Sequence, residues 1–285
     1  MNIIMNKEYV ISLTTIPSRI MMIEPVIKSL LDQLYPPKII YINLPKKYNR
    51  FKTKITIPKF LSKYENVKIF YVDTDYGPAT KFIGSLINPT ISPKTIIIVT
   101  DDDVIKKKNW SQLMLSYYDK NRVTSFVEKK LGNKIIWGYL GYIFRKDLFN
   151  VTDMLYFYKK VKCECILVDD HWLTGYCHYR NIEIYNIPIT IKENINIKNN
   201  GYPDALVKIN GNDSRLNVSE KCRRKIKKEF NTEFPFWCCI GCCKNGKRLT
   251  YVNNDDNKIY FINMQINTLI IILCICLVLF LIQRY

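Results

Sequence analysis

The residues best suited to chemistry are three consecutive aspartates, Asp101, Asp102 and Asp103, which directly follow an apolar run. Adjacent carboxylates repel one another, so such a cluster is favourable only where a cation or a set of donors compensates its charge. Mg²⁺ and Mn²⁺ prefer oxygen ligands and take one or two protein carboxylates, while substrate phosphates complete their shell. The cluster therefore indicates a divalent-metal site, and the same residues also suit a solvated loop or the first turn of a helix.

A second acidic pair, Asp169 and Asp170, precedes His171 at the start of an expected helix. Two adjacent carboxylates in a low-dielectric setting raise one pKa, which suits a general base that removes a proton from a hydroxyl. Asp170 is the preferred base, with Asp169 beside it. A helix N-cap followed by a first-turn acid is the structural alternative. His171 and His178 would lie about 10.5 Å apart along a helix, at roughly 1.5 Å per residue, too far to share one ion.

Single polar residues follow other expected strands. Arg19 and Lys81 carry donors suited to phosphate oxygens, although a single residue of this kind is more often a surface cation. Asp73 or Asp75 could accept hydrogen bonds from a base or ribose. An Asp before the Gly-Pro pair that follows is also ordinary turn chemistry.

The elements that must position these residues alternate between apolar runs and amphipathic segments, the pattern of a parallel α/β sheet. In such sheets ligands collect at the carboxyl ends of the strands. Three polar clusters, at residues 14–19, 73–81 and 101–103, fall at those ends. We expect strands at residues 9–13, 38–44, 67–73, 95–100 and 182–190, and helices at residues 24–34, 110–120 and 169–179.

Taken in order, four segments of the chain resemble a GT-A-fold glycosyltransferase family found in bacteria, algae and large DNA viruses: SLTTIPSR, DYGPATKFIGSL, IIIVTDDDV and VDDHWLTGY. The resemblance covers residues 7–192 and implies a Rossmann-like, mostly parallel α/β sheet flanked by helices. It also implies transfer of a sugar from a nucleotide-diphosphate sugar to a hydroxyl of an unknown glycan, protein or lipid acceptor. The implied cofactor is Mn²⁺ or Mg²⁺, and the implied stereochemistry is inverting.

The resemblance also implies roles for individual residues. Asp103 and Asp101 correspond to metal ligands, and Asp170 with Asp169 to the catalytic acids. The residues expected to bind the nucleotide sugar are Thr15, Arg19, Asp73, Asp75, Lys81, Asp101 and Asp102.

The C-terminal part has a different composition. Residues 260–282 form an apolar segment that predicts a transmembrane helix, because about 20 such residues cross a bilayer. Only three residues follow it, and the N-terminus lacks a signal-peptide pattern. We therefore expect a single-pass tail anchor with a cytosolic catalytic domain, preceded by a basic, Cys-containing juxtamembrane region at residues 193–259. A virus-encoded membrane protein fits this organisation.

The formal net charge of +18 concentrates anions without selecting among nucleotide sugars, acidic lipids and nucleic acid. We expect no nucleic acid partner. The alternative function is a membrane-anchored anion-binding protein with an inactive transferase-like core. A nucleotidyltransferase is a third possibility, but residues 14–19 lack the glycine-rich loop that it would need.

Two further features of the C-terminal region leave alternatives open. The basic run at residues 221–228 is either a membrane-surface or phosphate-binding patch or a solvated helical face. The CCxxCC group at residues 238–243, with Cys222, suits half a zinc site or reduced or lipidated cysteines.

Overall fold

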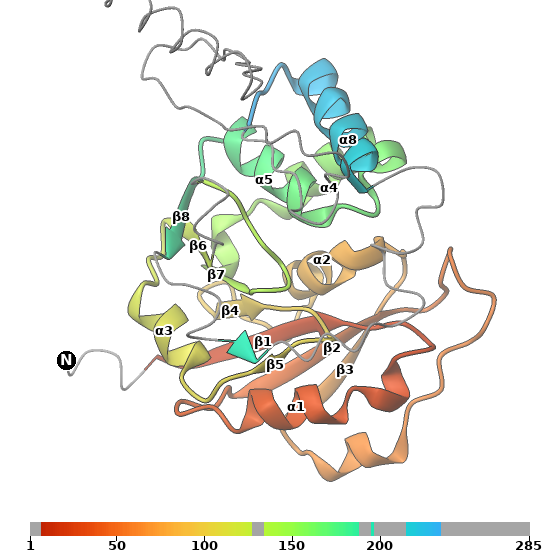
Figure 1. The fold of residues 1–285 in the computed structure, drawn as a ribbon, viewed down its shortest axis with the longest axis vertical. Helices are drawn as coiled ribbons and strands as arrows, with labels where there is room; N and C mark the ends of the chain where they lie inside the picture. Colours follow the sequence, from red (N-terminus) through yellow and green to blue (C-terminus); the bar gives the residue numbers. More distant parts are fainter. Residues whose placement is uncertain (1–6, 127–133, 188–194, 197–214, 235–285) are drawn as a thin grey trace, which may run out of the picture. The chain divides into compact units, whose positions relative to one another are not determined.

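Runs rich in Ile, Val and Tyr form the strands β1 (Tyr9–Thr14), β2 (Ile39–Pro45), β3 (Val67–Val72), β4 (Ile96–Val99), β6 (Arg122–Phe126), β7 (Tyr142–Arg145) and β8 (Glu183–Ile187). The structure, a computed structural model, describes residues 7–126, 134–187, 195–196 and 215–234. In this part of the chain the strands form one sheet in the order β3-β2-β1-β4-β7-β6-β8 (Figure 1). Four pairings are parallel, and β7 runs antiparallel to both of its neighbours. A separate antiparallel pair joins β5 (Ile105–Lys106) to β9 (Ile195–Asn196).

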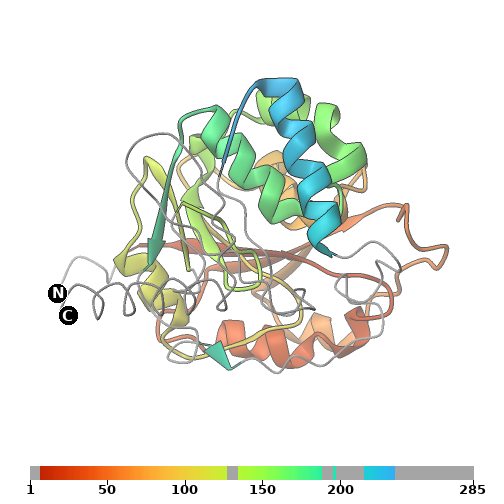
Figure 2. The same ribbon diagram turned by 45° about the horizontal axis from the view of Figure 1, so that its top comes forward.

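Helices cover both faces of the sheet (Figures 1 and 2). One face packs against α1 (Glu24–Leu31) and α3 (Trp110–Ser116), and the other side carries α2 (Thr80–Ile87), α4 (Val151–Cys165) and α5 (Asp169–Tyr179). Helix α8 (Arg215–Phe230) packs on α4 and α5. Along β4, Ile96 and Ile98 join the first core, and Ile97 and Val99 join the second. Strands buried on both faces need apolar side chains toward both, which explains their continuous apolar sequences. The predicted architecture, a mostly parallel, Rossmann-like α/β sheet flanked by helices, is confirmed.

The predicted elements form with shifted ends. The helix expected at residues 24–34 ends at Leu31, and the one expected at residues 110–120 ends at Ser116. The second stops early because the Tyr117 carbonyl accepts hydrogen bonds from the side chains of Arg122 and Thr124 instead of an α-helical amide. Helix α4 lies outside the expected elements. Four short 3-10 helices complete the described elements: η1 (Ile20–Met22), η2 (Lys59–Lys63), η3 (Gly77–Ala79) and η4 (Lys146–Leu148).

Helix α8 packs against α4 and α5, although its residues fall in the region expected to be juxtamembrane. The Phe230 ring stacks on Phe157 with 4.3 Å between centroids, and Ile226 is fully buried. A Cβ at Gly175 of α5 would lie 2.9 Å from the Ile226 side chain, so glycine permits this close helix contact. The compact unit that includes α8 spans Met1–Trp237.

Helix α8 carries the basic run at residues 221–228, and three glutamates offset part of the charge of its six basic residues. Arg223 and Arg224 pair with Glu220, Lys225 pairs with Glu229, and Lys227 pairs with Glu233. These ion pairs are typical of a solvated helical face, and the run keeps more basic than acidic residues, so an anion-binding surface stays the alternative.

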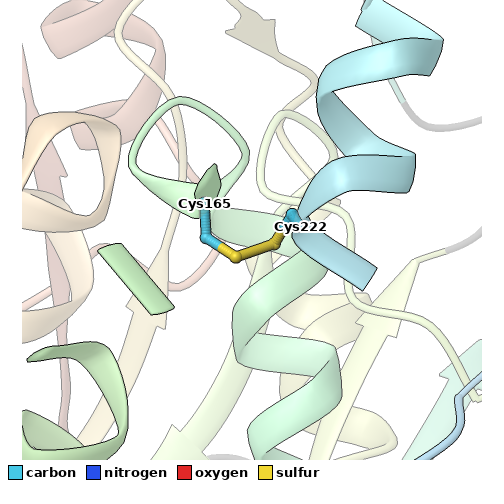
Figure 3. The surroundings of a disulfide bond; sticks show 2 residues. All are labelled: Cys165 and Cys222. Carbon is cyan, nitrogen blue, oxygen red and sulfur yellow. A yellow bond between two sulfur atoms is a disulfide. The ribbon is translucent and has the colours of Figure 1, made fainter. Parts of the chain in front are cut away.

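A disulfide joins Cys222 of α8 to Cys165 at the end of α4, with 4.7 Å between their Cα atoms (Figure 3). Cys222 is therefore engaged and does not serve as a zinc thiolate. The CCxxCC group and the predicted transmembrane helix at residues 260–282 lie outside the described residues. Within the described ranges, no helix is both long and apolar enough to cross a membrane.

Replacing Cys222 with alanine is expected to destabilise the domain, because the bond closes a loop between residues 57 positions apart. Chain-entropy arguments assign about 4 kcal/mol to a loop of this size. Thermal unfolding with and without dithiothreitol measures the effect, and the exposed Cys163→Ala variant is the matched control. If neither the Cys222→Ala substitution nor treatment of the unaltered chain with dithiothreitol changed the Tm, a structural disulfide would be contradicted. Since such bonds persist in oxidising compartments, their detection in cells also tests the expected cytosolic placement.

Candidate active site

The loop after β1 and the aspartates after β4 meet at the carboxyl edge of the sheet. Thr15 and Asp102 each lie three residues beyond the parallel register pair Ser12 and Val99, so the two strands deliver them side by side. Thr15 Oγ1 donates a hydrogen bond of 2.5 Å to Asp102 Oδ2. The sheet register thus joins two of the polar clusters predicted to meet.

Arg19, in the same loop as Thr15, forms ion pairs with Asp102 and Asp103. Its Nη1 lies 2.8 Å from Asp102 Oδ1 and 3.2 Å from Asp103 Oδ2. The side chain of Asp102 is only 4% exposed, whereas those of Asp101 and Asp103 are 31% and 27% exposed. Burial raises the pKa of Asp102 to about 7, although Arg19 acts to lower it. Asp102 therefore connects the two loops, and the side chains of Asp101 and Asp103 on either side of it are partly exposed.

Lys81 connects the aspartate cluster to the acidic pair of α5. Its Nζ lies 2.8 Å from Asp101 Oδ1 and 2.6 Å from Asp169 Oδ2, and its side chain is 3% exposed. Ser12 Oγ donates to the Lys81 carbonyl and fixes the start of α2 on β1. Burial opposes the charge of Lys81, but Asp101 and Asp169 outweigh it and raise the Lys81 pKa well above its ordinary value. The sequence predicted a phosphate-binding lysine, and the structure places it between two carboxylates.

Asp170 lies beside this network, in contact with an irregular segment that precedes β7. The Gly138 amide donates a hydrogen bond of 3.0 Å to Asp170 Oδ1. A Cβ at Gly138 would lie 2.6 Å from that oxygen and 3.1 Å from Lys81 Nζ, so only glycine permits this approach. Burial, followed by the charge of Asp169, raises the pKa of Asp170 to about 7. A carboxyl group with this pKa suits a general base near neutral pH.

The two aspartates after β3 are placed differently. Asp75 accepts hydrogen bonds from the amides of Asn49 and Gly77, so it shapes the turn into η3. Tyr48, next to Asn49, donates to the Thr15 carbonyl and connects this turn to the β1 loop. Asp73 is 86% exposed and pairs with Lys46. No described contact joins Asp73 to the other predicted site residues.

Lys106 is a buried residue near the site that the sequence analysis did not identify. It follows the aspartates on β5, is 4% exposed, and donates from Nζ to the Tyr139 carbonyl at 2.7 Å. Burial lowers its pKa to about 7, although Asp101 and Asp103 act to raise it. The chain contains 43 lysines and arginines, and nothing in the local sequence distinguishes this one.

The chain was also compared with known proteins, and no protein-family model and no curated protein matches it. Similar solved structures include the mannosyltransferase PcManGT from Pyrobaculum calidifontis in complex with GDP-Man and Mn²⁺, with a TM-score of 0.46 and 13% identity, covering 65% of this chain and 56% of that one. S. aureus TarS 1–349 matches with a TM-score of 0.43 and 14% identity, covering 64% and 59%.

A nucleotidyl transferase from Methanothermobacter thermautotroptrophicus is also similar, with a TM-score of 0.43 and 13% identity, covering 79% of this chain and all of that one. The chain spans little more than half the length of PcManGT and TarS.

Proposed function

We propose that this chain is a glycosyltransferase that moves a sugar from a nucleotide-diphosphate sugar to a hydroxyl of a glycan, protein or lipid acceptor. The observation that carries the proposal is the buried bridge of Lys81 between Asp101 and Asp169. It unites a solvent-facing acid cluster, suited to the donor diphosphate, with an acidic pair suited to activating an acceptor. A transfer reaction needs both halves within one site.

The chemistry of the donor set fits a divalent cation. Asp101 and Asp103 alternate with the buried Asp102 and face solvent, and each uses one carboxylate oxygen in its described ion pair. Mg²⁺ or Mn²⁺ takes one or two such carboxylates and completes its shell with phosphate oxygens and water. Within the described ranges no three His, Cys, Asp or Glu side chains form a ready-made metal cluster. A cation held by Asp101 and Asp103 would supply Lewis-acid stabilisation of the departing diphosphate.

In the proposed reaction Asp170 acts on the acceptor. Its carboxylate takes the proton from the acceptor hydroxyl while that oxygen bonds to the anomeric carbon, and the bond from this carbon to the diphosphate oxygen breaks. One displacement of this kind inverts the configuration. Thr15 and Arg19 hold Asp102 and so fix the loop that carries the two solvent-facing acids.

Replacing Asp103 with asparagine is expected to remove donor turnover and leave the fold intact. Loss of even a second-shell residue costs metal sites about 10–100-fold, so loss of a ligand should cost at least that much. The experiment screens nucleotide sugars with Mn²⁺ for hydrolysis by the 285-residue chain, then compares the variant with an exposed control, Asp119→Asn. Unchanged turnover in Asp103→Asn, with an unchanged Tm, would overturn the proposed function.

The single-pass anchor at residues 260–282 and the cytosolic placement stay part of the proposal. The alternative, an anion-binding protein, would rest on the basic run of α8, in which four basic residues pair with three glutamates. Salt-sensitive retention on nucleic acid that persists in Asp103→Asn would favour that alternative.

A further inference from the structure

Side chains, rather than strand pairing, hold the backbone of the irregular segment at residues 135–141. The amides of Ile136, Trp137 and Gly138 donate in turn to Thr174 Oγ1, Ser125 Oγ and Asp170 Oδ1, at 3.0–3.1 Å. Asn186 both accepts from the Ile135 amide and donates to its carbonyl. Backbone groups outside regular structure need such partners when buried, so this segment is fixed in one conformation.

The next two carbonyls of the segment are bound by the chain that follows the aspartates. Lys106 Nζ donates to the Tyr139 carbonyl at 2.7 Å, and Trp110 Nε1 donates to the Leu140 carbonyl at 2.9 Å. Gly141 then adopts φ +99°, with Trp110 packed where a Cβ would lie. Lys106 and Trp110, which follow the aspartates, thus donate hydrogen bonds to the same segment that contacts Asp170.

The partners of Lys106 are few for a buried ammonium group. Its described contacts are the Tyr139 carbonyl and the Trp110 ring, whose centroid lies 5.1 Å from Nζ. No ion pair to Lys106 occurs among the described residues. Burying such a charge is costly, and an aliphatic side chain would fill the same space at a lower cost. The position of the charge is therefore better explained by the carbonyl it holds than by packing.

We propose that Lys106 is a positioning residue for the transfer reaction, which holds the Tyr139 carbonyl and thereby keeps the Gly138 amide on Asp170. The inference rests on the proposed function, because Asp170 is the group that it positions. It links the two halves of the site a second time: Lys81 connects them through side chains, and Lys106 connects them through the backbone.

The test replaces Lys106 with methionine, which keeps the stem and removes the donor, in the 285-residue chain. Turnover of the nucleotide sugar found in the screen should fall about tenfold in kcat, since small misplacements of catalytic groups cost up to roughly 10²-fold. The donor KM should change by less than about twofold, because a residue acting only on Asp170 leaves donor binding intact. Hydrogen exchange at the amides of residues 136–141 should become faster, while exchange in β1 stays unchanged.

Lys108→Met is the matched control, because Lys108 is exposed, pairs with Asp32 and lies two residues along the chain. It should alter neither exchange nor kcat. Unchanged exchange in Lys106→Met would overturn the inference whatever the activity. Faster exchange with normal kcat would show a purely structural role, and a raised KM alone would assign Lys106 to the donor. If the unaltered chain turns over no nucleotide sugar, the proposed function fails, and the exchange data still decide whether Lys106 holds the segment.

Discussion

Replacing Asp170 with asparagine is expected to lower turnover by about 10²–10⁴-fold, the usual contribution of a general base. Asparagine keeps an Oδ1 that can accept from the Gly138 amide, so the variant loses the proton acceptor and keeps the contact. The donor KM should stay unchanged, because donor binding is assigned to the other half of the site. Steady-state kinetics with the donor and Mn²⁺ measure both, with Asp119→Asn as the control.

The pH dependence provides a second measurement on Asp170. Its pKa is raised to about 7 by burial and then by Asp169, and a base must be deprotonated to act. Turnover by the unaltered chain should therefore rise with pH through about 7 and level off above it. The residual activity of Asp170→Asn should lack this rise with pH. A rise that persists in the variant would assign it to another group with a pKa of about 7, Asp102 or Lys106.

Stability should change in the opposite direction to activity. A raised folded-state pKa means that Asp170 adds stability at low pH and loses this contribution as the pH rises through about 7. At pH 8 the asparagine variant should therefore be at least as stable as the unaltered chain. A lower Tm at pH 8 would show that the carboxylate is needed for folding, and the loss of turnover would then have a structural explanation.

Part of this site was predictable because it depends on strand ends. The aspartates after β4 and Thr15 after β1 meet through parallel register, and alternating apolar runs reveal such strands in a sequence. The start of α5 at Asp169 was also predicted, since acidic residues are favoured in the first turn of a helix. These features need only local patterns and one rule about sheet edges.

The rest depends on how the helices pack across the sheet. Lys81 meets Asp169 only because α2 and α5 lie on the same face, and no local pattern reports that pairing. From the sequence alone, Lys81 was therefore expected to bind phosphate. Lys106 was missed for a related reason, because the composition is rich in lysine and burial of a single ammonium group has no local signature. Helix α4 was missed although Phe157 and Val161, four residues apart, mark its buried face.

Replacing Lys81 with methionine is expected to destabilise the folded domain strongly at neutral pH. The substitution leaves Asp101 and Asp169 without their shared cation, and removing one partner of a buried ion pair costs about 3–5 kcal/mol. For a domain of this size that corresponds to a fall in Tm of roughly 6–20 °C. Thermal unfolding followed by circular dichroism measures it. The exposed pair of Lys46 and Asp73 provides the control, since Lys46→Met should change the Tm little.

The pH response separates this role from phosphate binding. Burial acts to raise the pKa of Asp101 and Lys81 acts to lower it, so without Lys81 that pKa should rise above its unfolded value. The variant should then regain stability as the pH falls and Asp101 takes up a proton. The Tm gap to the unaltered chain should therefore narrow from pH 7 to pH 5, and Asp169→Asn in the same chain should restore part of the loss. An unchanged or higher Tm in Lys81→Met, together with a lower nucleotide affinity, would contradict the structural role of the bridge and favour phosphate binding. That result would restore the interpretation drawn from the sequence and remove the bridge on which the proposed function rests.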